Sequence, residues 1–398
     1  MSTVIPLKRE NRQTTREMLK GIKVIDVDTH VSEWYDLWTS RAPASLKDRV
    51  PRFVTRDGVS RWIIEDDVFL APAGANSAVM KDGSKINGMK FIESELPDVH
   101  EGAHDVKARL RYMDEAGLHA QIAYPNVLGF GGQKAMQVDQ SLREVSIEIF
   151  NDAMAEMQAE SGNRILPMAL LPWWDVKKAV AEAERCQTMG LHGVNINPDP
   201  HTHGYPSLGH ESWNPLWEVC TGLDLPVNFH IGSSDVAMSW YADASWPERT
   251  PDEQLALGGV MLFIGNLRVM ANILMSKMLE RYPTLKIVSV ESGAGWVPYL
   301  LEALSYMSRE AGLTHEPFED VFRRQIYACT FFERENLLDT MRQVGIDNLL
   351  FETDFPHPAC LFPDDLDHLE EPIASMSADE RFKFFSGNAA RVYNIPID

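Results

Sequence analysis

The feature that most constrains the fold of this 398-residue chain is a regular alternation of short apolar runs with helical patterns. The runs are rich in β-branched residues, and a segment with apolar residues at helical spacing separates each run from the next. The predicted strands are Lys23–Val27, His119–Tyr124, Arg164–Leu170, His192–Ile196, Leu225–His230, Leu285–Val290, Gln325–Cys329 and Asn348–Glu352. Because strands that alternate with helices form parallel sheets, we predict an α/β fold, a distorted (β/α)8 barrel of the TIM type, rather than an open sheet.

Three long stretches interrupt this pattern. Residues 31–105 are an insertion after the first strand, and its segment RWIIEDDVFLAPAG predicts a small hairpin beside the barrel mouth. Asn197–Asn214 and Ile231–Gly258 follow the fourth and fifth strands, and loops of this length usually serve as lids or substrate walls. No linker or low-complexity segment divides the chain. We therefore expect one barrel domain over residues 21–398, preceded by an N-terminal extension, residues 1–20.

Composition and charge exclude several classes of protein. Lys and Arg number 37 against 58 Asp and Glu, and the net charge of −21 would repel the phosphates of nucleic acid. The four cysteines show no CxxC spacing, so we expect neither a disulfide scaffold nor a structural zinc site. The N-terminus lacks the apolar region of a signal peptide, and no apolar run reaches the roughly 18 residues of a spanning helix. These features predict a cytoplasmic protein that binds a small molecule, no nucleic acid and no membrane.

Residues able to bind a metal ion stand at the ends of four predicted strands. Strand alternation would place Asp26, Asp28 and His30 on one face at the end of the first strand. A carboxylate and an imidazole at a barrel mouth form a plausible half of a metal site, although an Asp that caps the next turn beside an unrelated His is the alternative.

The other three strand ends carry similar groups. His230 ends the fifth strand, Glu291 follows the sixth in VESGAGW, and Asp354 and His357 follow the eighth in FETDFPHP. Each has an ordinary structural alternative: a rim histidine, a carboxylate at a helix start, or a turn stiffened by proline. In a closed barrel, however, Asp28, His30, His230, Glu291 and Asp354 would all lie on one rim, where barrel active sites are built.

The sequence resembles the amidohydrolase superfamily, in its amidohydrolase-related branch. Five segments carry this resemblance: IDVDTH, RLRYMDEAGLHAQIAYP, NPLWEVCTGLDLPVNFHIG, RYPTLKIVSVESGAGWVP and LLFETDFPHP. The resemblance runs from about Gly21 to the C-terminus. Members of this branch include aminocarboxymuconate semialdehyde decarboxylase, hydroxybenzoate-type decarboxylases and assorted hydrolases. The resemblance also implies a homodimer.

The resemblance assigns roles residue by residue. The family's first motif is His-x-His, which here reads Asp28 and His30; its strand-five ligand matches His230, and its strand-eight Asp, a ligand or general base, matches Asp354. Decarboxylases of the branch commonly have a catalytic His after strand six, where this chain has Glu291. We therefore expect Asp28, His30, His230, Glu291 and Asp354 to bind metal.

Two histidines with carboxylates suit Zn²⁺, Mn²⁺ or Fe²⁺, with one or two ions per chain. Our first hypothesis is a hydrolase in which a metal-activated water attacks a small carbonyl-containing or carboxylate-containing substrate, with Asp354 or Glu291 as general base and His357 orienting Asp354 or touching substrate. The alternatives are a metal-dependent non-oxidative decarboxylase, a non-heme diiron oxygenase on the same barrel, and a barrel that has lost catalysis. Fold alone does not choose among them.

Two further groups are predicted to have structural roles. His201, His203 and His210 are predicted to lie in a solvated loop after the fourth strand. Arg109 and Arg111 precede the second strand on a helix, and we expect them to pair with acidic residues on that surface.

Overall fold

The structure is a computed structural model that describes residues 14–243 and 246–397. Most of the extension predicted over residues 1–20 lies outside these ranges. The described chain begins with a short helix, α1 (Thr15–Met18), whose N-cap Thr14 and Glu17 form a reciprocal capping box.

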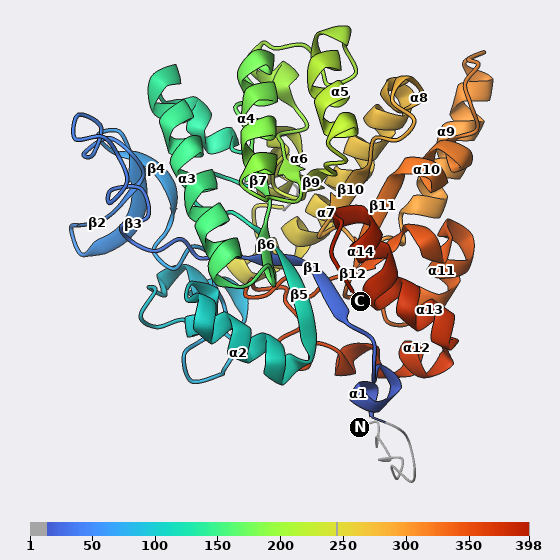
Figure 1. The fold of residues 1–398 in the computed structure, drawn as a ribbon, viewed down its shortest axis with the longest axis horizontal. Helices are drawn as coiled ribbons and strands as arrows, with labels where there is room; N and C mark the ends of the chain where they lie inside the picture. The colour runs from blue at the N-terminus through green and yellow to red at the C-terminus, as the bar shows by residue number, and fades with distance from the viewer. Residues whose placement is uncertain (1–13, 244–245, 398) are drawn as a thin grey trace.

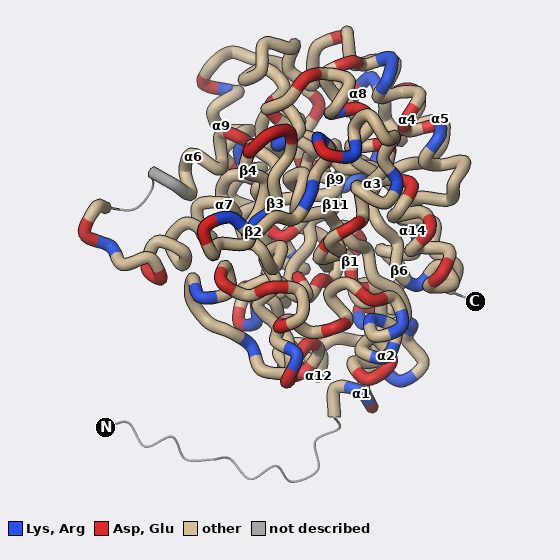
Figure 2. Tube along the Cα trace, turned by 90° about the vertical axis from the view of Figure 1, so that its left-hand side faces the viewer, with Lys and Arg blue, Asp and Glu red and all other residues tan. Residues whose placement is uncertain are grey.

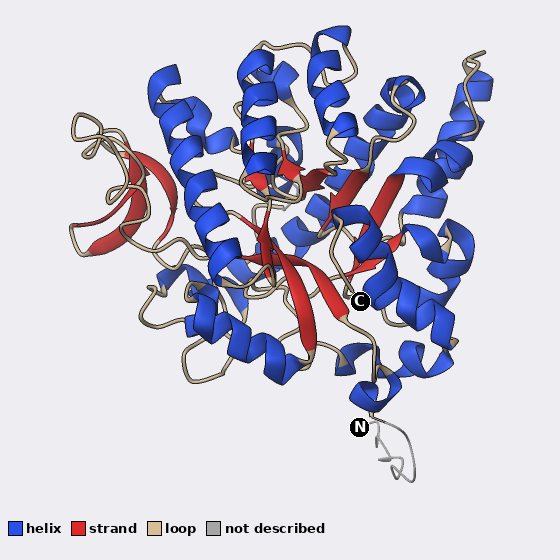
Figure 3. Ribbon diagram, viewed as in Figure 1, coloured by secondary structure: helices blue, strands red, loops and turns tan. Residues whose placement is uncertain are grey.

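Parallel strands form the predicted barrel, with helices around it (Figures 1 and 3). They are β1 (Val24–His30), β5 (Leu118–Tyr124), β6 (Ile165–Pro167), β7 (Ala169–Leu170), β8 (Val194–Asn195), β9 (Val227–His230), β10 (Ile287–Val290), β11 (Ile326–Thr330) and β12 (Leu349–Phe351). One arc pairs in the order β1-β5-β6 and the other in the order β7-β8-β9-β10-β11-β12. Both arcs run in chain order, as in a (β/α)8 barrel.

Short contacts join the two arcs at both ends. β6 and β7 are halves of one predicted strand, and Met168 between them donates its N–H to Ala123 O of β5, while Ala169 donates to Gly193 O before β8. On the other side, a parallel bridge pairs Thr29 of β1 with Phe355, just beyond β12. The barrel is therefore closed but irregular at these two seams.

The barrel interior is filled with side chains from β-branched and other apolar residues of the strands. Ile25, Val27, Ile122, Val288 and Val290 are completely buried in one cluster with the C-terminal segment. That segment supplies the helix α14 (Asn388–Tyr393), and the Tyr393 hydroxyl donates to Asn228 Oδ1 of β9. The C-terminus thus contributes to the barrel core, and the strand ends of β1, β9, β10 and β12 are left for the predicted site.

The helices surround the barrel, and several begin at side-chain caps that the sequence supplies. Asp105, Asp139 and Asp175 each accept a backbone N–H at the start of α2, α3 and α4. The helices are α2 (Val106–Ala116), α3 (Gln140–Glu160), α4 (Val176–Thr188), α5 (Asn214–Gly222), α6 (Asp235–Asp243), α7 (Pro251–Met275), α8 (Met278–Arg281), α9 (Val297–Glu310), α10 (Phe318–Gln325), α11 (Leu337–Val344), α12 (Glu370–Ser375) and α13 (Ala378–Phe382).

The insertion after β1 contains the predicted hairpin and one strand more. β2 (Arg52–Arg56), β3 (Val59–Ile64) and β4 (Val68–Pro72) form an antiparallel sheet in that order. Figure 1 shows this sheet at one side of the molecule, away from the barrel strands. The rest of the insertion contains the 3₁₀ turns η1 (Gly88–Glu93) and η2 (Glu101–Ala103).

The segments predicted as lid loops are partly helical. Residues 197–214 contain the 3₁₀ turns η4 (Pro200–His203) and η5 (Glu211–Trp213), whereas 231–258 contain α6 and the start of α7. A capping box of Thr250 and Glu253, with Pro251 in the first turn, starts α7 inside the segment that was predicted as the second lid loop.

The helix α7 also qualifies the prediction that no segment could span a membrane. By length and composition it is apolar enough to do so, with a mean hydropathy of 1.6 over its most apolar window, of which 39% is buried. It packs against α6, α9, α10 and β9. Core helices pass the same test, so this feature carries no membrane assignment. Along the chain trace, Lys and Arg positions are interspersed with Asp and Glu positions (Figure 2).

Candidate metal centre

The structure brings together all five residues predicted as metal ligands. Asp28 and His30 come from the end of β1, His230 from β9, Glu291 directly follows β10 and Asp354 follows β12. Candidate ligand atoms of Asp28, His30, His230 and Glu291 all lie within 4.8 Å of one another, and so do those of His30, Glu291, Asp354 and His357. The two groups share His30 and Glu291, and every member is buried.

Nitrogen and oxygen atoms in the cluster stand at distances typical of ligands around one ion. His30 Nε2 lies 3.0 Å from His230 Nε2 and 3.6 Å from both Asp28 Oδ1 and Asp354 Oδ1. His230 Nε2 lies 3.4 Å from Asp28 Oδ1 and 3.3 Å from Glu291 Oε2. Ligands bound at about 2.1 Å to one ion stand roughly 3.0–3.4 Å apart, so a divalent ion fits this spacing.

A hydrogen bond at Nδ1, the ring nitrogen that faces away from the cluster, sets the tautomer of His230. Nδ1 lies 2.7 Å from Ile231 O. A carbonyl oxygen can only accept, so Nδ1 must carry the proton. In the neutral ring, the lone pair of Nε2 therefore faces the cluster, as in histidines that bind metals.

His357 is held by the same kind of bond. Its Nε2 lies 2.7 Å from Asn126 Oδ1, and the Asn126 amide is oriented by donation from Nδ2 to Val31 O at 2.9 Å. Because Oδ1 can only accept, Nε2 must be the protonated nitrogen of a neutral His357. Its Nδ1 then points toward Asp354, with Oδ1 at 3.1 Å, and the ring stacks on His30 with centroids 3.5 Å apart.

Unpaired buried oxygens show that the site fits a cation. Both carboxylate oxygens of Asp28 and both of Asp354 are buried, and neither carboxylate accepts a hydrogen bond from any residue that the structure describes. Leaving such groups unpaired costs several kcal/mol, whereas a divalent ion would satisfy them. The donor set of imidazole and carboxylate suits Zn²⁺, Mn²⁺ or Fe²⁺.

Burial shifts the pKa values of the cluster carboxyls upward. It raises the pKa of Glu291 to about 8 and that of Asp354 well above its usual range. Burial also lowers the pKa of His30 and His357. Burial acts to lower the pKa of His230 too, but the neighbouring carboxylates of Asp28 and Glu291 outweigh it and raise that pKa.

Two of the carboxylates stand on unusual backbone. Glu291 has a φ of 59° and Asp354 a φ of 60°, in the left-handed region that residues with a side chain seldom adopt. Such strain, about 1–2 kcal/mol per residue, tends to occur at functional sites. Asp354 is held there by donation of its N–H to Asp28 O at 2.9 Å, which ties the end of β12 to β1.

Glu352 is a further buried carboxylate that sequence reasoning did not select. Its Oε2 accepts the N–H of Glu291 at 3.1 Å, and burial raises its pKa well above the usual range. It thereby supports the strained backbone of Glu291. The FETD motif contains it, two residues before Asp354, so strand alternation could have indicated it.

Asp26 is not part of the cluster, and the prediction that it shares a face with Asp28 and His30 is wrong. The pairing of β1 with β5 shifts register between Asp26 and Thr29, which breaks the alternation. Asp26 instead accepts hydrogen bonds from Gln121 Nε2 at 2.9 Å and from the Thr353 N–H and hydroxyl at 2.9 and 2.7 Å.

Arg109 also differs from its predicted role in surface ion pairs. It is buried, and its guanidinium donates to Gln121 Oε1 at 2.7 Å, to His30 O at 3.1 Å and to Gly102 O at 3.0 Å. Arg109 thus fixes the backbone of His30 from behind. Sequence reasoning missed it because the interior position of a helix residue depends on packing.

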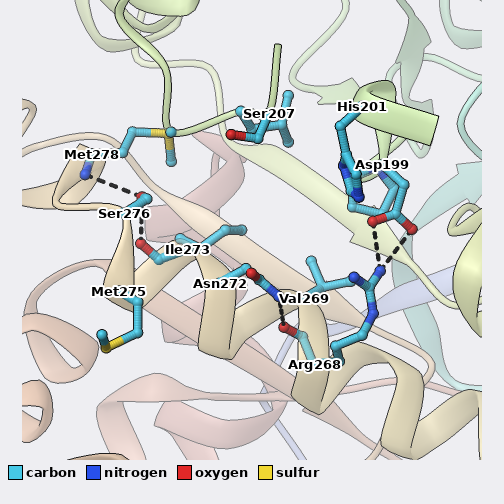
Figure 4. A pocket seen from close by; sticks show the side chains of 13 residues that line it. Asp199, His201, Ser207, Arg268, Val269, Asn272, Ile273, Met275, Ser276 and Met278 are labelled. Carbon is cyan, nitrogen blue, oxygen red and sulfur yellow. Dashed lines mark hydrogen bonds and ion pairs between the residues drawn. The ribbon is translucent and has the colours of Figure 1, made fainter. Parts of the chain in front are cut away.

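The long loop after β8 stands apart from the cluster. His203 Nε2 pairs with Asp235 Oδ2 at 2.8 Å, and His201 lines a cavity of about 280 Å³ between this loop and α7 (Figure 4). In the same cavity Arg268 binds both oxygens of Asp199, at 2.6 and 2.7 Å. His201 and His210 are exposed, as predicted, whereas His203 is half-buried.

Comparison with known proteins agrees with this architecture. A family model described as amidohydrolase matches residues 25–395. The gamma-resorcylate decarboxylase of Polaromonas sp. is 27% identical over 327 residues, which is 76% of this chain and 92% of that protein.

Solved structures give the same fold. An amidohydrolase from Mycobacterium avium subsp. paratuberculosis superposes with a TM-score of 0.72 at 22% identity, over 94% of this chain and 99% of that one. A dihydroxybenzoic acid decarboxylase from Polaromonas sp., with bound manganese and the inhibitor 2-nitroresorcinol, gives 0.60 at 21% identity, over 94% and 97%.

Proposed function

The chain belongs to the amidohydrolase family, which makes it a metal-dependent hydrolase or carboxy-lyase, and we propose that it is a non-oxidative decarboxylase of a small aromatic hydroxy acid. The observation that carries the proposal is the buried cluster of His30, His230 and unpaired carboxylates. Similarity to a decarboxylase over three-quarters of the chain favours this reaction over the hydrolysis that the sequence first suggested.

We assign metal binding to Asp28, His30, His230 and Asp354. Their support is the fit of lone pairs and unpaired oxygens described above. A bound divalent ion would polarise the carboxylate and phenol oxygens of a substrate and offset charge as the carbon–carbon bond breaks. Glu291, which the sequence also suggested as a ligand, contacts the same group, with Oε2 3.3 Å from His230 Nε2, and we assign it a different role.

The protein must also supply a proton. In non-oxidative decarboxylation the bond between the ring carbon and the carboxyl carbon breaks, CO₂ leaves, and the ring carbon takes up a proton. Glu291 stands where decarboxylases of this family commonly have a histidine, and burial raises the pKa of its carboxyl, which favours the protonated form that can donate. We assign the proton donation to a carboxyl oxygen of Glu291.

A panel of acids tests this proposal. Protein purified without an affinity-metal step is assayed for metal by mass spectrometry and then incubated with hydroxybenzoates that carry one or two hydroxyl groups. We expect about one divalent ion per chain and release of CO₂ with an equal amount of the phenol. Glu291→Gln should keep the metal and lose turnover, while Glu302→Gln, an exposed change on α9, should alter neither. Metal-loaded protein that releases no CO₂ from any acid contradicts the proposal.

A two-metal oxygenase is the second candidate, and one observation favours it. The two overlapping groups of ligand atoms, one with Asp28 and His230 and the other with Asp354 and His357, share His30 and Glu291. Bridging carboxylates are suited to a pair of irons. About two irons per chain, with O₂ consumption in the presence of a reductant and an organic acid, would replace the decarboxylase proposal with this one.

A further inference from the structure

Phe130 covers the candidate metal centre, and we propose that its side chain is the gate through which a substrate reaches the cluster. Its ring centroid lies 4.5 Å from that of His230, 5.2 Å from His30 and 5.8 Å from His357. The inference rests on the proposed function to the extent that the substrate binds at this cluster, but it does not depend on which reaction follows.

The ring leaves no room for a substrate beneath it. Aromatic rings in contact have centroids about 4.5–7 Å apart, so Phe130 is in direct contact with all three imidazoles. A second planar ring placed between them would require the separation to grow by about one ring thickness. A substrate that binds the cluster must therefore displace the Phe130 ring.

The backbone around Phe130 is held firmly, so the side chain is the part that can move. Asn195 Nδ2 donates to Phe130 O, and Trp173 Nε1 donates to Gly131 O at 3.0 Å. Gln133 Nε2 donates to Gly232 O at 2.7 Å, which joins this loop to the segment after His230. These bonds fix the loop, whereas rotation about the two side-chain torsions of Phe130 breaks none of them.

Gly232 leaves the space that the Phe130 ring occupies. It has a φ of 73°, and a Cβ at this position would lie 2.8 Å from Phe130 Cδ2. Any other residue would therefore push the ring from its place over His230. The position of the glycine, two residues after a predicted ligand, makes room for the covering ring.

The side chains of the cluster are almost completely shielded from solvent. The side chains of His30, His230 and Asp354 are completely buried, and only small fractions of Glu291 and His357, 9% and 7%, reach solvent. Phe130 itself is half-buried, unlike the histidines it covers. Rotation of one side chain would thus expose the imidazoles without unfolding any element.

Carbethoxylation of histidines tests the gate in metal-free protein. Wild type and Phe130→Ala are treated with diethylpyrocarbonate, and peptides are mapped over time by mass spectrometry. Loss of the covering ring should speed the modification of His30, His230 and His357 by about tenfold or more. Phe69→Ala, which removes an exposed ring from β4, is the matched control and should change none of these rates.

An internal reference detects general loosening of the fold. His192 bonds to Tyr393 O and lies beside the C-terminal segment, so its rate should stay unchanged in every variant. If Phe130→Ala also speeds His192, the decision passes to Phe130→Leu, which keeps apolar packing and should give intermediate rates. The deciding variant is Phe130→Ala, or Phe130→Leu if the alanine variant loosens the fold. If His30, His230 and His357 are modified in that variant at the wild-type rates, the proposal is overturned.

Metal release separates this inference from the proposed function. In metal-loaded protein, Phe130→Ala should lose its ion to a chelator about tenfold faster, and the larger ring of Phe130→Trp should slow the loss. If Phe130→Ala holds its full metal content but releases the metal and is labelled at the wild-type rates, the gate is refuted and the proposed function is not. Protein that never holds a metal but shows the labelling difference refutes the metal chemistry and keeps the gate.

Discussion

Replacement of Glu33 by Gln should change how stability depends on pH. Glu33 is completely buried in the loop after β1, where Oε1 accepts the N–H groups of Asn126 and Val127 at 2.8 and 2.9 Å. Its Oε2 has no hydrogen-bond partner in the part of the chain that the structure describes. Burial raises the pKa of Glu33 from 4.5 to about 7, so ionisation of this carboxyl opposes folding.

The sign and the magnitude follow from proton linkage. Because the folded-state pKa lies above the unfolded value, the folded protein binds the proton more tightly between pH 4.5 and 7. The free energy of unfolding therefore falls as the pH rises through this window and levels off above it. At about 1.4 kcal/mol per pH unit, the Glu33 contribution lost between pH 4.5 and 9 is about 3 kcal/mol.

Gln keeps the accepting oxygen but cannot ionise, so it should remove this part of the pH dependence. Guanidinium denaturation of metal-free protein, followed by tryptophan fluorescence at several pH values, measures the free energy of unfolding of both proteins. Relative to wild type, we expect Glu33→Gln to gain about 3 kcal/mol between pH 4.5 and 9. Glu302→Gln, an exposed change, should follow wild type. If the curves of Glu33→Gln and wild type run parallel, Glu33 does not ionise in the folded protein and the argument from burial fails.

Three further changes should affect the site in distinct ways. Asn126→Leu removes the acceptor for the Nε2 proton of His357, and turnover should fall by about 10–100-fold. Metal content by mass spectrometry should stay the same, and an unchanged turnover would show that this bond does not matter. Arg109→Met leaves His30 O and Gln121 unpaired, so the free energy of unfolding should drop by about 2–3 kcal/mol; an unchanged denaturation midpoint would contradict this. Complete removal of metal should abolish turnover and lower the melting temperature, with recovery on addition of Mn²⁺; activity in fully chelated protein would exclude metal catalysis.

The predicted fold and the convergence of the five ligand candidates depended on features that are local in the sequence. Buried β-branched runs such as those of β10 and β11 are recognisable without any tertiary contact, and their number indicated the barrel. Once a parallel barrel is assumed, its carboxyl strand ends must meet at one rim. That rule alone brought His230 and Asp354 together, although 123 residues separate them.

The prediction failed where a single local pattern had more than one spatial outcome. Asp26 and Asp28 are two residues apart, and only the irregular pairing of β1 with β5 sends one toward Gln121 and the other into the cluster. Likewise, the helix pattern around Arg109 does not show which of its polar residues faces the barrel. Burial of that guanidinium depends on the carbonyls of His30 and Gly102, which come from other segments.

The sequence by itself thus determined the barrel and the chemical groups at its rim, because strand periodicity and residue type are properties of short segments. Only the tertiary structure decided the tautomers of His230 and His357, the support of Glu291 by Glu352 and the cover provided by Phe130. These features require atoms from distant segments to lie within hydrogen-bonding or van der Waals distance. Such contacts arise from the packing of the whole barrel, and no short stretch of sequence encodes them.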